Sequence, residues 1–170
     1  MSKTIAINRA PVLTLWAAVV AERMGYKWDE ALSLGQCVAG KTAHSKAKTL
    51  GLRQDKPDAE KKPATRKPDE LIELCGRQIA VIRTKNGLRA LNCDKETDPA
   101  AVQRYLAKAF GEYLDEVTEA MRKLASKHKV DDLCQRAFGL YEKFRPVVDY
   151  GVKGWGQKGT LDIERITALE

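Results

Sequence analysis

The stretch from Val12 to Met24 is the most apolar segment of the chain, and it restricts the possible folds more than any other feature. Its large apolar residues recur at the spacing of one helix face, which predicts a helix. They are Val12, Leu15, Trp16, Val19, Val20 and Met24. Pro11 fits the first turn of this helix, and Gly25 fits a left-handed position after its end. The apolar run over residues 12–21 is too short to span a bilayer, so we expect no membrane segment.

A second helical pattern opens near Asp29 and Glu30, two acids that suit a helix N-terminus. The order helix, glycine turn, helix is the outline of a helix-turn-helix. The residues at its small, turn and buried positions are Ala21, Gly25, Ala31 and Leu34. In that motif the N-terminal residues of the second helix contact DNA bases, and two acids there would face a polyanion. The alternative is an ordinary helical hairpin that packs its own core.

Residues 35–42, GQCVAGKT, match the P-loop pattern G-x-x-x-x-G-K-[ST]. In a P-loop the backbone N–H groups surround phosphates, while here Lys41 would reach the terminal phosphates and Thr42 would bind magnesium. Such a loop follows a buried strand, but residues 29–34, DEALSL, contain no β-branched residue. The chain also offers no convincing apolar strand that ends in Asp. The alternative is a helix with two glycines and an interruption at Gly40, and we expect no cofactor.

The positive charge of the chain is concentrated in residues 41–67, which we call the basic segment. It contains nine Lys or Arg and three Asp or Glu residues, and so holds +6 of the formal net charge of +7. A localised basic patch is typical of a polyanion partner. The alternative is a solvated linker kept soluble by its charge. The candidate nucleic-acid-binding residues within it are Lys41, Lys46, Lys48, Arg53, Lys61, Lys62, Arg66 and Lys67.

Residues 54–68, QDKPDAEKKPATRKP, contain three prolines and no large apolar residue. A segment of this composition cannot bury a core, so it predicts a linker or long loop. The linker divides the chain into an N-terminal helical hairpin, residues 1–53, and an α-rich body, residues 69–170.

The body begins with a predicted short helix over residues 69–75. Two strand-like runs separated by Asn86-Gly87 then predict a β-hairpin over residues 77–92. Its basic residues are expected to form the solvated side of the hairpin. They are Arg77, Arg83, Lys85 and Arg89.

Asp98 and Pro99 open the clearest helix of the chain, which Gly111 bends or divides. Asp131 or Asp132 is expected to cap a further helix that ends at Pro146. The last helix is expected to start at Thr160 or Asp162.

The loop over residues 149–160 contains four glycines around Trp155, with a lysine on each side. An aromatic ring among lysines could stack on a base, which makes Trp155 a further candidate for nucleic-acid binding. The alternative is that the ring anchors the loop on the core.

The four cysteines are widely spaced without a C-x-x-C pattern, and with the absence of a signal peptide they indicate free thiols in the cytoplasm. They are Cys37, Cys75, Cys93 and Cys134. With only His44 and His128 in addition, a zinc site of the usual type is not expected. No pattern of nucleophile and base emerges, so a non-enzymatic protein is favoured.

The segment PVLTLWAAVVAERMGYKWDEALSLG, together with YEKFRPVVDYGVKGWGQKGTLDIERI, resembles an uncharacterised family of small bacterial proteins. The resemblance touches both ends and most of the middle of the chain. It implies no settled activity and assigns no site residue.

Together these patterns predict a mainly α protein, a helical hairpin plus a helical bundle with one small β-hairpin. The predicted function is non-enzymatic binding of nucleic acid, DNA or RNA, through phosphates. A second hypothesis is a helical module that binds a protein partner or a second copy of itself through the apolar N-terminal hairpin. A third is a P-loop-like nucleotide-binding enzyme that uses Lys41 and Thr42.

Overall fold

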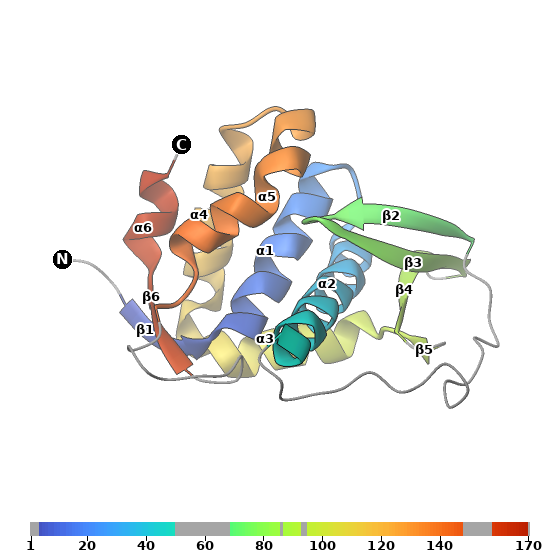
Figure 1. The fold of residues 1–170 in the computed structure, drawn as a ribbon, viewed down its shortest axis with the longest axis horizontal. Coiled ribbons are helices and arrows are strands. Elements are labelled where there is room, and N and C mark those ends of the chain that lie inside the picture. The colour runs from blue at the N-terminus through green and yellow to red at the C-terminus, as the bar shows by residue number, and fades with distance from the viewer. Residues whose placement is uncertain (1–3, 50–68, 86, 93–94, 148–157, 170) are drawn as a thin grey trace.

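The computed structural model describes residues 4–49, 69–85, 87–92, 95–147 and 158–169, and at residues 41–49, 92, 95 and 158 it describes only the backbone. A group of helices lies between a two-stranded and a four-stranded antiparallel sheet (Figure 1). The fold is therefore mixed α/β, and the prediction of a mainly α protein with one hairpin is wrong. The elements are β1 (Thr4–Asn8), α1 (Arg9–Arg23), α2 (Trp28–Thr49), β2 (Glu70–Leu74), β3 (Arg77–Thr84), β4 (Gly87–Asn92), β5 (Lys95–Glu96), α3 (Pro99–Phe110), the 3-10 helix η2 (Gly111–Tyr113), α4 (Leu114–Ser126), α5 (Val130–Phe144), β6 (Lys158–Asp162) and α6 (Ile163–Ala168).

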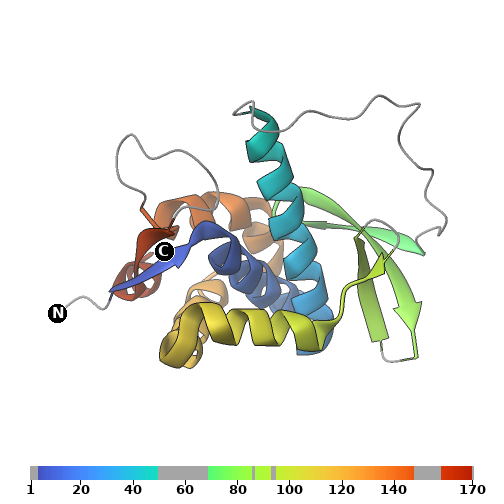
Figure 2. The ribbon, with the colours of Figure 1, turned by 90° about the horizontal axis from the view of Figure 1, so that it is seen from below.

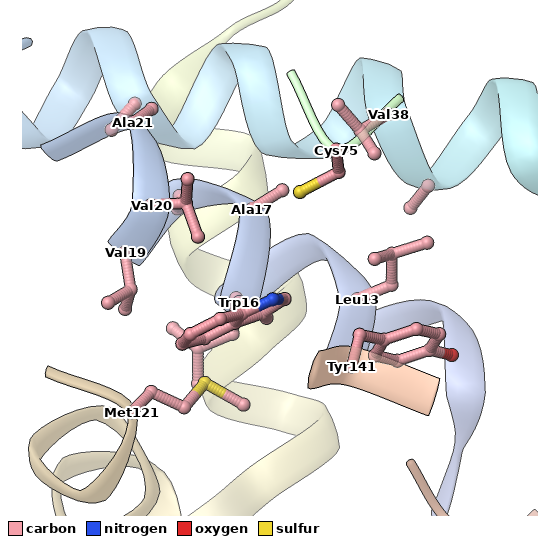
Figure 3. Packing of buried hydrophobic residues seen from close by; sticks show 14 of the residues in the cluster. Leu13, Trp16, Ala17, Val19, Val20, Ala21, Val38, Cys75, Met121 and Tyr141 are labelled. Atoms are coloured by element: carbon pink, nitrogen blue, oxygen red, sulfur yellow. The ribbon is translucent and has the colours of Figure 1, made fainter. Parts of the chain in front are cut away.

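Helix α1 lies at the centre of the core, and every residue from Pro11 to Ala21 is buried. The indole Nε1 of Trp16 donates a 2.8 Å hydrogen bond to the carbonyl oxygen of Ala137 on α5. The Trp16 ring also packs edge-on against Phe144, with 5.3 Å between the centroids. Figure 3 shows Trp16 enclosed by side chains from several elements. Because α1 is covered on all sides, it must be apolar all round.

Helix α2 is continuous from Trp28 to Thr49, so the expected interruption at Gly40 is absent. Gly25 makes the turn before α2 with a positive φ of 114°, as predicted. Gly35 lies where α1 and α2 cross. A Cβ at this position would collide with the carbonyl oxygen of Thr14 and lie 3.1 Å from the backbone nitrogen of Ala18. Glycine at position 35 therefore allows the two helix backbones to touch.

The four-stranded sheet has the order β2-β3-β4-β5. Its β3–β4 hairpin confirms the prediction over residues 77–92. The predicted short helix over residues 69–75 is wrong, because most of these residues form β2. Leu74 pairs with Arg77, so Cys75 and Gly76 form a two-residue turn with φ values of 49° and 77°. Two positive φ values are what a type I′ hairpin turn requires.

Side chains of α2 bind the backbone of β4. Glu30 Oε2 accepts a 2.8 Å hydrogen bond from the Leu88 N–H, and Ser33 Oγ accepts one of 3.2 Å from the Ala90 N–H. Unpaired N–H groups at a strand edge can bind other strands. Here side chains of α2 supply the acceptors for two N–H groups of β4. We call these two contacts the α2–β4 seam.

Strands β1 and β6 pair antiparallel and bring the two ends of the described chain together. This sheet was not predicted: residues 158–160 were assigned to the Trp155 loop and residues 4–8 to no element. The start of α6 agrees with prediction, because Asp162 Oδ1 accepts a 3.0 Å hydrogen bond from the Glu164 N–H.

The other helix ends agree with the sequence in part. Asp98 caps α3 through a 3.0 Å bond from the Ala100 N–H, and Gly111 divides α3 from α4, both as predicted. α5 starts at Val130, so Asp131 and Asp132 lie in its first turn and the predicted cap is wrong. The buried apolar residues form one cluster that extends from β1 to α6. The predicted division of the chain at residues 54–68 falls outside the described residues.

Candidate nucleic-acid interface

The structure places only the first part of the basic segment. Lys41, Lys46 and Lys48 lie on the last turns of α2, where the backbone alone is described. The other predicted site residues lie outside the described residues: Arg53, Lys61, Lys62, Arg66, Lys67 and Trp155. Whether these side chains gather in one surface therefore stays a prediction.

The basic segment begins at the end of the helical hairpin where α1 starts. α1 and α2 are joined by a short turn and run antiparallel, and Gly35 packs against Thr14 and Ala18. Two turns farther along α2, Lys41 and Thr42 lie at the level of the first turn of α1. The last turns of α2 stand clear of the neighbouring helices (Figure 2). This end of the molecule is the candidate interface.

The arginines of the β-hairpin are not part of this interface. Arg83 is exposed and forms a 2.8 Å ion pair with Glu70 on β2. Arg89 is buried, with 8% of its surface exposed, and forms a 3.1 Å ion pair with Asp29 in the first turn of α2. The prediction that Arg89 lies on the solvated side of the hairpin is wrong, because Asp29 gives it a partner at the opposite end of α2.

The α2–β4 seam also bears on the helix-turn-helix interpretation. A recognition helix must present its N-terminal residues to the major groove. Here Asp29 is paired with Arg89, and the carboxylate of Glu30 is bonded to Lys27 and Leu88. The acidic side chains in the first turn of α2 are therefore bound to the sheet, which gives no support to a recognition helix at this end.

The segment that matches the P-loop pattern, residues 35–42, lies inside helix α2. All of residues 35–42 are helical, and residues 28–34 directly before them belong to the same helix. Within the helix, the backbone N–H groups that would surround a phosphate are bonded to carbonyls one turn earlier. The helix crossing explains Gly35 without any ligand. The geometry therefore gives no support to a nucleotide site at Lys41 and Thr42.

Two cavities flank Tyr105 on α3. One of about 350 Å³ lies between α3, β1 and the start of α1, and is bordered by Asn8 and Lys108. The other, of about 270 Å³, lies between α3 and α2 and is bordered by Gln36 and Asp98. No sequence pattern indicated either cavity, because their walls come from distant parts of the chain. They have the size of small-ligand sites, but the residues around them form no nucleophile–base pair.

The thiols of Cys75 and Cys134 are not activated by their surroundings. The structure describes no disulfide at Cys37, Cys75 or Cys134, and Cys93 lies outside the described residues. Burial raises the pKa of Cys75 to about 12 and also raises the pKa of Cys134. Because the thiolate is the reactive form, neither sulfur is activated. Within the described parts of the chain, no group of three His, Cys, Asp or Glu could hold a metal ion, and no helix is long and apolar enough to cross a membrane.

Comparison of the chain with protein-family models, with curated proteins and with solved structures finds no match. Function is therefore inferred from the charge and geometry of the chain itself.

Proposed function

We propose that this protein binds nucleic acid without catalysing a reaction, and that the basic segment contacts the phosphates. The observation that carries the proposal is the location of the charge: residues 41–67 hold +6 of a total of +7. A linker that only needs to be solvated could carry either sign, whereas nine cations against three acids favour a polyanion partner.

The position of α2 supports this proposal. The basic segment starts on helical turns that stand clear of the neighbouring helices (Figure 2). Lys41, Lys46 and Lys48 all belong to these turns. Cations at a helix C-terminus gain roughly 0.3–1 kcal/mol from the helix dipole. The helix dipole can account for lysines on the last turns of α2, but it does not account for the additional Lys and Arg residues between 50 and 67.

The competing hypothesis of a protein-binding module depended on an exposed apolar face of the N-terminal hairpin. That face is not available, because α1 is buried from Pro11 to Ala21 and α2 packs on it. The described surface exposes few large apolar side chains, namely Leu71, Tyr105 and Val147. Binding through charge is therefore the better-supported function.

The proposal is tested by fluorescence anisotropy at low salt, where electrostatic attraction is strongest. The probes are a labelled duplex DNA, a single-stranded DNA and a single-stranded RNA, each in two unrelated sequences. We expect the unmodified protein to bind, with similar affinity for unrelated sequences of one type. A variant with Lys46→Gln, Lys48→Gln, Lys61→Gln and Lys62→Gln should bind more weakly to all probes.

The matched control changes four lysines outside the basic segment instead: Lys27→Gln, Lys85→Gln, Lys123→Gln and Lys129→Gln. These side chains are exposed, and the net charge falls by the same amount. Binding by this control should stay close to that of the unmodified protein. If the two variants lose the same amount of affinity, binding depends only on the net charge of the protein and not on the basic segment. Undetectable binding of every probe would overturn the proposal.

A further inference from the structure

Arg9, at the start of α1, lies against the end of α5, where Arg145 follows the helix. Arg9 Nε donates a 3.1 Å hydrogen bond to the carbonyl oxygen of Pro146, the residue that follows Arg145. The Tyr141 hydroxyl donates to the carbonyl oxygen of Arg9 at 3.4 Å. The guanidinium of Arg9 is therefore fixed beside the end of α5, although 136 residues separate it from Arg145 in the sequence.

Neither of these cations has an acidic partner among the described residues. Three other arginines do have one, in the pairs Arg83–Glu70, Arg89–Asp29 and Arg122–Glu22. Among the residues that the structure describes, the terminal nitrogens of Arg9 and the guanidinium of Arg145 have no hydrogen-bond or ion-pair partner. Glu142, on the last turn of α5, is exposed and does not pair with either arginine.

The surroundings of these arginines favour an anion. Both side chains are partly buried, so water screens their charges less than at an open surface. Burial, and then the neighbouring charge of Arg145, lower the pKa of Arg9. Two cations that repel each other are stabilised by an anion between them. Guanidinium groups form bidentate, charge-assisted hydrogen bonds with phosphate oxygens.

The arginine pair also lies at the candidate interface. Arg9 is the first residue of α1, and α1 starts at the end of the hairpin where the basic segment begins. No local sequence pattern could indicate this site, because the two arginines are 136 positions apart and only the fold brings them near each other.

We infer that Arg9 and Arg145 form a phosphate-binding site outside the basic segment, which holds one phosphate of the nucleic-acid backbone. The terminal nitrogens of both guanidinium groups donate to its oxygens, and Arg9 Nε stays bonded to Pro146. This inference rests on the proposed function for the source of the phosphate, whereas the anion site itself can be tested alone.

The first test uses Arg145→Gln, which breaks no hydrogen bond of the described structure. We expect its Kd for the single-stranded DNA probe to rise roughly five- to tenfold, the loss expected for one charge-assisted contact. The control is Arg83→Gln, an exposed arginine on the hairpin, and its Kd should hardly change. A third variant, Arg9→Lys, keeps the charge but loses the planar guanidinium group that can form two parallel hydrogen bonds. Its Kd should lie between those of the other two variants.

The second test titrates the unmodified protein with pyrophosphate and follows the arginine Nε–Hε signals by NMR. The signals of Arg9 and Arg145 should shift with a saturable dependence on concentration, and that of Arg83 should not. If DNA binds but Arg145→Gln behaves like Arg83→Gln, the inference is overturned while the proposed function stands. If no nucleic acid binds but pyrophosphate shifts both signals, the proposed function fails and the anion site stands.

Discussion

Gly35 and Gly40 belong to the same P-loop spelling but have different surroundings in the fold. A Cβ at Gly35 would collide with the backbone of α1, whereas a Cβ at Gly40 would meet nothing within 4 Å. The two glycines are thus a matched pair within one helix. If they were present for phosphate binding, both would be needed, whereas the helix crossing requires glycine at position 35 only.

We predict opposite effects on stability when each glycine is changed to alanine. Gly35→Ala should lower the free energy of unfolding by about 1–3 kcal/mol, the usual cost of overpacking. Gly40→Ala should raise it by about 0.5–1 kcal/mol, because alanine loses less backbone entropy in a helix. Urea unfolding measures both changes. A Gly35→Ala protein as stable as the unmodified one would contradict the described crossing of α1 and α2.

Arg89 and Arg9 show how partners across the fold decide the role of a charge. Neither arginine has its partner close by in the sequence. Arg89 is neutralised by Asp29, which is 60 residues away, whereas Arg9 meets a second arginine. The basic segment could be predicted because its charges are neighbours in sequence. The arginine pair could not, because only folding brings it together.

Ser33 on α2 is the polar residue on which the α2–β4 seam depends most clearly. Its hydroxyl oxygen accepts from the buried Ala90 N–H, and Ser33 is itself fully buried. Ser33→Ala would leave that N–H without a partner, and should lower the free energy of unfolding by about 1–3 kcal/mol. The control is Ser126→Ala, where an exposed hydroxyl bonds only within its own helix. Urea unfolding of both variants checks the prediction, and equal effects would show that the seam adds no stability.

The elements that were predicted correctly carry local signals. α1 has its apolar stripe, α3 has Asp98 before Pro99, and the β3–β4 hairpin has Asn86-Gly87. The missed elements lack such signals. β2 reads ELIEL, a spacing that also fits a helix turn, and only its pairing with β3 selects the strand. β1 and β6 are five residues each, and each is stabilised as a strand only by pairing with the other.

The central position of α1 affects how the chain should respond to cleavage. The segment over residues 54–67 contains many basic cleavage sites and no large apolar anchor. We predict that limited trypsin digestion cuts there first. Because α1 is buried in a core shared with α4 and α5, the two fragments should stay together on size-exclusion chromatography under native conditions. Early cutting within residues 99–144, or separation of the fragments, would contradict this description.

The uneven distribution of charge links the fold to the proposed function. On the sheet side, Arg83 and Arg89 are each paired with an acid. The opposite end of the α1–α2 hairpin starts the basic segment and carries the arginine pair. A polyanion should therefore approach from one end, and its affinity should depend on how many phosphates that end neutralises.

The most direct test of this account is the dependence of duplex DNA affinity on salt. Each neutralised phosphate releases condensed counterions, so the logarithm of the binding constant falls by about 0.9 per contact for each unit of log salt. Four to six contacts predict a slope of roughly −4 to −5 for the unmodified protein. The variant with Gln at positions 46, 48, 61 and 62 should have a slope shallower by up to about 4. The control with Gln at positions 27, 85, 123 and 129 should keep the original slope. A slope near zero, or the same slope in all three proteins, would contradict the assignment of phosphate binding to the basic segment.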